Sequence, residues 1–400
     1  MQKFAFFAIP FMFVLGQWQL IEKIYFPHAS ILFLLILCVL TNGVSASHTL
    51  PKSFLGWTLF YLLTTILTTW ITFDLEALRA STQLLLFIFS VMLPCLLLSD
   101  EKSIISFLYA MLVGATCNAI TGIVQSAIWI SNYGIVLTAN GEWFRVIGNS
   151  LTPIDYIMQL LIGFALCELL KNVQLRYLAR SFFGVCLLFS NSRSALIVLV
   201  FFIIYRFSST SLKTAVLYAS LLSLILLLGV LSDAGQLVFS RFLDVFNFDF
   251  NIKRMITFEN VLLRIFTEME YIILGHGYGK YEFFHPIDLD IYNNPHNIYL
   301  YVLFSGGILG FVSFFGLIVY LALAIQKLKR RAKDSLHIYH LAWSIEFLFI
   351  AALLIGLVET NIIGIGASWT LGLCFGCVLA TNRAILHRQL ITVLSNRKNY

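Results

Sequence analysis

A histidine beside a proline is the side chain of this sequence best suited to proton transfer. His296 follows Asn294 and Pro295 and stands directly before a long apolar run. Proline favours the first turn of a helix and asparagine its N-cap, so this spacing predicts Asn294 as the N-cap and His296 in the first turn. A helix N-terminus disfavours a protonated ring, so the imidazole should be neutral and able to accept a proton. A histidine that merely caps its helix is the alternative.

Arg193 is the first candidate for binding an anion. It lies at the apex of an apolar hairpin with basic residues at both ends, and each arm has about 14 apolar residues, or about 21 Å of helix against a hydrocarbon core of about 30 Å. We therefore expect Arg193 below the outer membrane surface, where an arginine is costly unless it faces a polar cavity or an anion. A guanidinium matches phosphate oxygens in a fork, so phosphate is the expected ligand. An arginine that snorkels at an ordinary turn is the alternative.

More cations occupy residues 231–295, the one long polar interval of the chain. The basic residues of this loop are Arg241, Lys253, Arg254, Arg264 and Lys280. Apolar residues recur at helical spacing between Met255 and Met269, which predicts an amphipathic helix lying on the outer membrane face. The loop is therefore expected to place several cations at the outer surface.

The two arginines of this predicted helix should differ in their surroundings. Arg254 and Arg264 are ten residues apart and point in different directions if one helix spans both. Arg264 can form an ion pair with Glu268 four residues on, whereas Arg254 has no acid three or four residues later. Arg254 is thus expected to be the freer cation.

The loop offers no recognisable metal or cofactor site. The glycines from Gly275 to Gly279 are interpreted as a tight turn that ends the amphipathic helix, because a Walker loop needs a preceding strand and a Gly-Lys-Ser/Thr ending. The carboxylates lack the spacing of a zinc or EF-hand site. Cys374 and Cys377 have redox-motif spacing, but they lie within an apolar run with no His or acid nearby. We therefore expect no metal and no other cofactor.

The composition places these residues in a membrane protein. Of the 400 residues 60% are hydrophobic and 12% charged, far from the globular norm of about 45–50% apolar and about 25% charged. This excludes a disordered chain, a coiled coil and a disulfide-stapled secreted module. The net charge of +6 does not indicate a nucleic-acid partner, because cytoplasmic loops of membrane proteins are enriched in Lys and Arg.

About twelve transmembrane helices are expected to position the candidate residues. The apolar segments lie near residues 4–20, 29–42, 53–72, 82–99, 103–130, 152–170, 177–190, 194–207, 214–232, 297–326, 337–359 and 362–380. Such continuous runs are not typical of a membrane barrel. Basic clusters at 327–333 and 383–398 predict cytoplasmic termini, with residues 231–295 outside. We expect an all-α integral membrane protein, with residues 1–400 forming a single polytopic domain.

Several of these motifs, in this order, resemble the bacterial O-antigen ligase and O-antigen polymerase superfamily. These motifs are Ser192-Arg193-x-x-Leu196, then Leu274-Gly-His-Gly-Tyr-Gly279 in the long outer loop, then His296-Asn297-x-x-Leu300 and Gly307-x-x-Gly310. The motif likeness spans about residues 191–310. The number of spans and the place of the loop are similar along the whole chain.

The resemblance implies a GT-C type glycosyltransferase of the bacterial inner membrane that works at the periplasmic face without a metal. Its donor would be an oligosaccharide carried on undecaprenyl diphosphate. Arg193 and His296 match the family's arginine and its histidine, which is thought to act as base. Arg254 best fits the family's second arginine, with Arg264 as the alternative. The expected substrate-binding residues are Arg264, Asn297, Lys280 and Arg241.

The resemblance leaves two acceptors open. A polymerase joins one lipid-linked glycan to another, whereas a ligase transfers the chain to the lipid A-core of lipopolysaccharide. The proline before His296 and the Ile-Tyr-Leu after it resemble polymerases, while the spacing from His296 to Gly307 also fits ligases. We expect an O-antigen polymerase, with ligase as the alternative. Membrane lipids and a chain-length regulator protein are further expected partners.

A secondary transporter or flippase is a remote alternative. Transporters tend to show inverted repeats, with charges near the bilayer midplane. The charges of this chain instead crowd one face.

Overall fold

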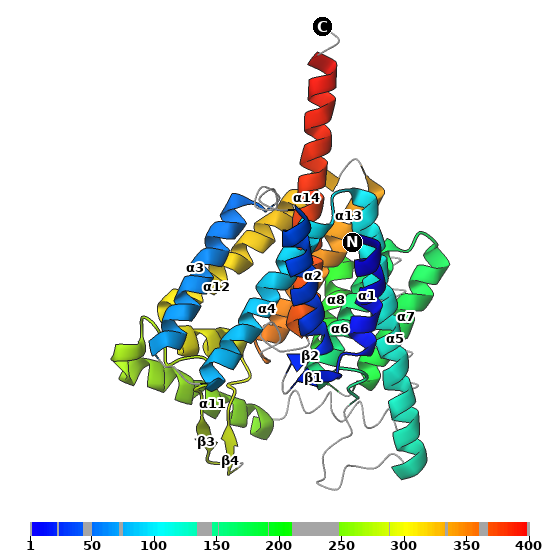
Figure 1. The fold of residues 1–400 in the computed structure, drawn as a ribbon. Coiled ribbons are helices and arrows are strands. Elements are labelled where there is room, and N and C mark those ends of the chain that lie inside the picture. The colour runs from blue at the N-terminus through cyan, green and yellow to red at the C-terminus, as the bar shows by residue number, and fades with distance from the viewer. Residues whose placement is uncertain are drawn as a thin grey trace.

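Helices form most of the computed structural model (Figure 1). The structure describes residues 2–21, 24–42, 50–71, 75–133, 146–150, 152–190, 192–209, 248–287, 289–332, 335–359 and 367–397. The α-helices are α1 Gln2–Val14, α2 Phe26–Asn42, α3 Lys52–Ile71, α4 Leu75–Leu97, α5 Glu101–Tyr133, α6 Pro153–Leu166, α7 Val173–Phe189, α8 Arg193–Ser209, α11 Phe248–Thr267, α12 Ile298–Arg331, α13 Leu336–Gly356 and α14 Ala367–Arg397. Two antiparallel hairpins accompany them, formed by β1 Gln19–Ile21 with β2 Ile24–Tyr25 and by β3 Phe283–His285 with β4 Asp290–Tyr292.

The helices follow the predicted apolar segments closely. Eleven of the twelve segments coincide with a described helix, and the remaining one, 214–232, lies outside the described residues. Within the described residues, four helices are long and apolar enough to cross a membrane, at Glu101–Trp129, Ile298–Arg331, Ile338–Gly356 and Ala367–Gln389. The fold is thus that of a helical membrane protein, while the number of spans stays a prediction.

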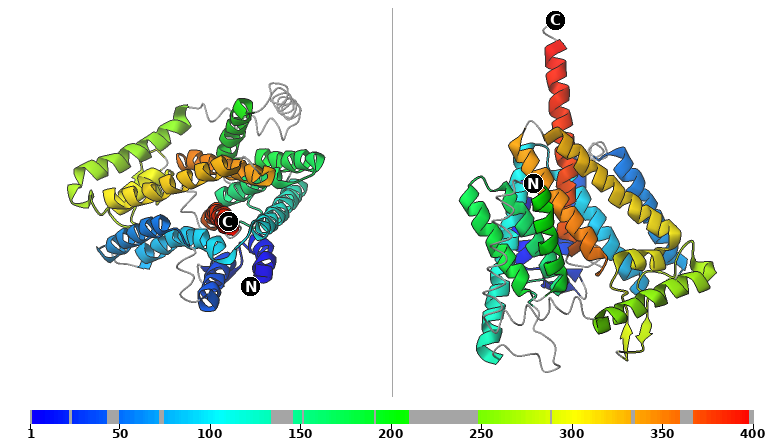
Figure 2. Two further views of the ribbon diagram at one scale, coloured as in Figure 1. Left: turned by 90° about the horizontal axis from the view of Figure 1, so that it is seen from above. Right: turned by 180° about the vertical axis from the view of Figure 1, so that it is seen from behind.

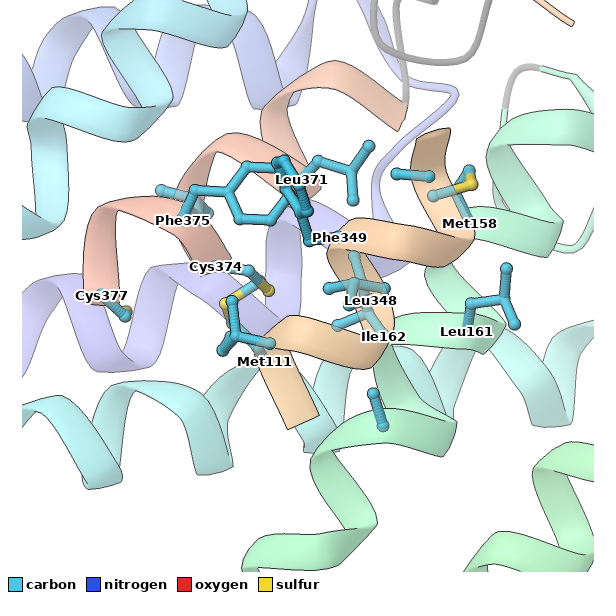
Figure 3. Packing of buried hydrophobic residues seen from close by; sticks show 14 of the residues in the cluster. Met111, Met158, Leu161, Ile162, Leu348, Phe349, Leu371, Cys374, Phe375 and Cys377 are labelled. Atoms are coloured by element: carbon cyan, nitrogen blue, oxygen red, sulfur yellow. The ribbon is translucent and has the colours of Figure 1, made fainter. Parts of the chain in front are cut away.

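Helix α14 forms the centre of the bundle. It packs along α4 and also contacts α5, α6, α12 and α13, and Figure 2 shows it surrounded by the other helices when viewed from above. Gly372 and Gly376, one turn apart, let α14 approach α4 closely: a Cβ on Gly376 would lie 2.4 Å from the carbonyl oxygen of Val91. Cys374 and Cys377 are buried in this core. Figure 3 shows them among buried side chains of α5, α6 and α13.

The long loop gathers at one end of the bundle. Helix α11 and the hairpin β3–β4 lie at the end opposite the C-terminus, beneath α3 and α12, which pack against each other (Figure 1). Helix α11 buries Val261 and Ile265 against Tyr281 and Phe304. Ile252, Ile256 and Phe258 are half-buried, whereas Met255, Leu262, Leu263, Phe266 and the following Met269 are exposed. The predicted single apolar face is therefore divided: one strip packs on the protein and the other is open, as a membrane-surface helix requires.

Helix α12 is interrupted at Gly307, whose φ of 60° and ψ of −164° are not helical. Residues 272–277 of the loop pass along this break and satisfy the backbone groups that it frees. His276 and Gly277 donate their N–H groups to the carbonyl oxygens of Phe304 and Ser305, at 2.9 and 3.0 Å. In return, the N–H of Ile308 donates to the carbonyl of Ile272, at 2.9 Å. The glycine-rich segment is therefore a partner of the broken helix. The prediction that it ends the amphipathic helix is wrong, because α11 already stops at Thr267.

Glycines are required where these two segments meet. Gly275, Gly277 and Gly279 have positive φ angles of 78°, 101° and 78°. A Cβ on Gly275 would lie 2.3 Å from the carbonyl oxygen of Ser305, and one on Gly307 would lie 2.4 Å from that of Ile273. Neither position can accept a side chain without moving backbone.

We expect Gly307→Ala to destabilise the protein strongly. With φ 60° and ψ −164°, Gly307 lies in a backbone region populated essentially by glycine alone, where a side chain costs on the order of 1–3 kcal/mol, and the backbone clash adds to this. Gly56→Ala on α3 is the matched control, because a Cβ there meets nothing within 4 Å. Thermal unfolding in detergent, followed by the monodisperse fraction in gel filtration, should show a lower Tm for Gly307→Ala alone. Equal Tm values would contradict the role given to the break.

Candidate active site

His296 lies in a tight turn just before α12. Its N–H donates to the side-chain oxygen of Asn294 at 2.8 Å, and its φ of 51° is in the left-handed region, which non-glycine residues rarely adopt. The N-cap of α12 is Asn297, whose side-chain oxygen accepts from Tyr299 and Leu300, both at 3.0 Å. The prediction of Asn294 as N-cap and of His296 in the first turn is therefore wrong, because Asn294 closes the turn that precedes the helix.

The imidazole of His296 faces a carboxylate that sequence analysis did not identify. Nδ1 of His296 lies 3.4 Å from Oε2 of Glu359, which follows the end of α13. The side chain of His296 is 42% exposed and Nε2 has no hydrogen-bond partner among the described residues. An ionised carboxylate only accepts, so this contact favours the tautomer with the proton on Nδ1, in which the lone pair of Nε2 can accept a proton. The ring is thus arranged to take up a proton.

Arg254 reaches the same carboxylate from α11. Its Nη2 lies 3.4 Å from Oε1 of Glu359, and its Nη1 donates to the carbonyl oxygen of Val358 at 2.8 Å. The side chain of Arg254 keeps 27% of its surface exposed. The structure therefore brings together two of the predicted site residues, Arg254 and His296, through a third residue 63 positions beyond the histidine. The expectation that Arg254 is the freer cation is thus wrong, because it pairs with a residue distant in sequence.

The hairpin β3–β4 holds this group from beneath. The ring of the buried His285 stacks on Tyr292, with centroids 4.9 Å apart, and Tyr292 in turn meets His296 edge-on at 6.0 Å. Nε2 of His285 lies 3.0 Å from the carbonyl oxygen of Lys253, the residue before Arg254. Because the N–H of Ile287 donates to the other ring nitrogen, Nε2 is the donor in the neutral ring. The hairpin thereby fixes α11 relative to the turn of His296.

Arg264 belongs to a second cluster. It forms the predicted ion pair with Glu268, at 3.2 Å, and lies over the ring of Phe304, 4.9 Å from its centroid. His276 contacts the other oxygen of Glu268 at 2.7 Å and stacks on Phe304 at 4.1 Å. Burial alone would raise the pKa of Glu268, but the hydrogen bonds from His276 and Arg264 outweigh it and lower the pKa. These contacts tie the end of α11 to the broken helix.

The structure describes only some of the remaining predicted site residues. Asn297 is buried, and its side-chain N–H₂ donates to the carbonyl of Leu357 at 2.9 Å, so its observed contacts are structural. Lys280 is exposed in the loop. Arg241 lies outside the described residues, and so does the side chain of Arg193. The backbone of Arg193 begins α8, at the apex of the predicted helical hairpin.

Helix α7, the other arm of that hairpin, is anchored at its start. Glu168 forms ion pairs with Arg180 and, at 3.3 Å, with Arg176. His340 of α13 lies 3.0 Å from the same carboxylate. A buried carboxylate needs such partners, so these contacts fix α7 relative to α13.

No group of three or more His, Cys, Asp or Glu side chains in the described part of the chain is arranged to hold a metal ion. The positive charge of the candidate site comes from Arg254. A site of this kind can bind an anion at the guanidinium and accept a proton at the neighbouring imidazole.

Comparison with known proteins agrees with this arrangement. No curated protein matches the chain. The sequence model of a family described as O-antigen ligase matches residues 178–315, which include α8, α11, the glycine-rich segment and His296. Residues 178–315 are therefore similar to the O-antigen ligase family, and this match supports membership of the O-antigen ligase and O-antigen polymerase superfamily.

Proposed function

We propose that this protein transfers a glycan from undecaprenyl diphosphate to an acceptor hydroxyl, at the periplasmic face of the bacterial inner membrane. The observation that carries the proposal is the group formed by Arg254, Glu359 and His296, which joins a cation, a carboxylate and an open imidazole at the loop end of the bundle. The match of residues 178–315 to the family described as O-antigen ligase supports glycan transfer of the O-antigen type.

The proposed chemistry follows from charge development. As the anomeric C–O bond breaks, negative charge grows on the diphosphate, and a fixed guanidinium stabilises it. Arg254 supplies this charge, with Arg193 as the second expected ligand. His296 takes the proton of the acceptor hydroxyl at Nε2, and the oxygen attacks the anomeric carbon from the face opposite the leaving group. The configuration at that carbon is then inverted.

We propose a second lipid-linked repeat unit as the acceptor, which makes the protein an O-antigen polymerase of the GT-C type. Ligation to lipid A-core is the second candidate, favoured by the description of the matching family. Deleting the gene in a bacterium with smooth lipopolysaccharide and separating its glycans on a gel tests both. A single repeat unit on core indicates a polymerase, whereas bare core with accumulated lipid-linked polymer indicates a ligase. An unchanged ladder would contradict both.

We expect His296→Ala to lower transfer by about 10²–10⁴-fold, the usual contribution of a positioned base. The measurement is turnover of lipid-linked donor by purified protein. His387→Ala is the control, since His387 is exposed on α14, far along the helix that projects from the opposite end (Figure 1). Near wild-type turnover by a folded His296→Ala protein would contradict the base assignment.

We expect Arg254→Ala to lower transfer by about 10²–10³-fold, because it removes charge at the developing diphosphate. Arg264→Ala is the matched control on the same helix and should reduce transfer only several-fold, because Arg264 contacts Glu268 and Phe304 and does not share the carboxylate that faces His296. Both variants are compared with the same donor at equal folded fractions. A larger loss for Arg264→Ala would reverse the assignment.

We expect Arg193→Lys to lose most transfer activity, because an ammonium keeps the charge but not the bidentate fork. Lys171→Arg, just before α7 and away from the apex of the hairpin, is the control for the effect of a Lys/Arg exchange on donor turnover. Donor turnover is measured for both. Wild-type turnover by Arg193→Lys would favour a snorkelling arginine.

A further inference from the structure

Glu359 is held in a fixed position between the candidate base and the candidate anion-binding arginine. Its N–H donates to the carbonyl oxygen of Ile355 at 2.8 Å, so the last turn of α13 continues into this residue. The side chain of Asn297 binds the carbonyl of Leu357 at 2.9 Å, which connects the same turn to the start of α12. The backbone that carries the carboxylate is thus fixed by two helix ends.

The two carboxylate oxygens of Glu359 are used separately. Oε2 lies 3.4 Å from Nδ1 of His296, and Oε1 lies 3.4 Å from Nη2 of Arg254. The Glu359 side chain keeps 25% of its surface exposed, so the group lies in a solvent-accessible site and not in the bundle core. One carboxylate can therefore influence a proton acceptor and an anion ligand at once.

We propose that Glu359 is a positioning residue of the transfer reaction: it holds His296 with Nε2 open for the acceptor proton, and it occupies Arg254 until the donor diphosphate replaces it. This inference rests on the proposed function. Glu359 itself touches neither the breaking nor the forming bond.

The first part follows from hydrogen-bond chemistry. A neutral imidazole carries one proton, and a carboxylate can only accept, so Glu359 selects the tautomer with the proton on Nδ1. An amide at this position could donate to Nδ1 and favour the opposite tautomer, with the proton on Nε2. In the Ser-His-Asp triad of serine proteases, where a carboxylate likewise orients a histidine, exchanging the carboxylate for an amide leaves the geometry intact but lowers the rate greatly. Glu359→Gln should therefore impair proton transfer without disturbing the fold.

The second part follows from charge. A diphosphate and a carboxylate are both anions, so they compete for the guanidinium of Arg254 and repel each other when close. Removing the charge of Glu359 removes this competitor. Binding of the diphosphate should then be as tight as in the wild type or tighter, although transfer is slower.

Glu359→Gln should therefore slow transfer while diphosphate binding stays equal or becomes tighter. This combination distinguishes a positioning role from a merely structural one. The experiment uses the full-length protein in nanodiscs and measures two quantities. Transfer is followed with lipid-linked repeat units, and the Kd of undecaprenyl diphosphate is measured without acceptor. Glu359→Gln is compared with Glu359→Asp, which keeps the charge, and with Glu270→Gln, which removes an exposed carboxylate of the 231–295 loop.

For Glu359→Gln we expect transfer to fall about 10²-fold, while the Kd of undecaprenyl diphosphate stays equal or decreases. Glu359→Asp should recover part of the rate, and Glu270→Gln should behave as wild type. Wild-type transfer by Glu359→Gln would overturn the inference. So would a weaker affinity for undecaprenyl diphosphate, because it indicates a damaged site. If His296→Ala also transfers at the wild-type rate, or the wild type does not transfer at all, the proposed function fails instead.

Discussion

The pairing of the broken helix α12 with residues 272–277 is the constraint on which the candidate site depends. A helix break at membrane depth frees backbone N–H and C=O groups, and each unpaired group costs several kcal/mol in a hydrocarbon environment. The loop removes this cost by donating to Phe304 and Ser305 and accepting from Ile308. The break at Gly307 is thus stable only while the loop is docked. The positions of α11 and of the hairpin follow from that docking.

Because the loop is docked in this way, three separate stretches of sequence meet at the candidate site. Helix α11 brings Arg254, the turn before α12 brings His296, and the end of α13 brings Glu359. The cluster of Arg264, Glu268 and His276 fastens the far end of α11 to Phe304, while His285 fastens its near part. The two ends of α11 thereby have different tasks, since one positions the helix and the other presents a cation.

Sequence patterns were sufficient for the helices because those depend on composition and periodicity. Long apolar runs predicted the helices, and the repeat from Met255 to Met269 predicted α11, including the pair of Arg264 with Glu268. They were insufficient where partners are distant in sequence. Glu359 sits at the end of an apolar run, and only the packing of α13 beside α12 shows that it faces His296. Its one sequence signal is an acid at the end of a span, on the same side as the basic loop.

In the proposed reaction, the diphosphate of the donor binds at Arg254 with its sugar beside His296. A cryo-electron microscopy structure of the protein with bound undecaprenyl diphosphate tests this most directly. The account predicts phosphate oxygens within hydrogen-bond distance of the Arg254 guanidinium, with Glu359 displaced from it and still facing Nδ1 of His296. Density for the diphosphate at Arg264 and His276, with Arg254 still paired to Glu359, would contradict it.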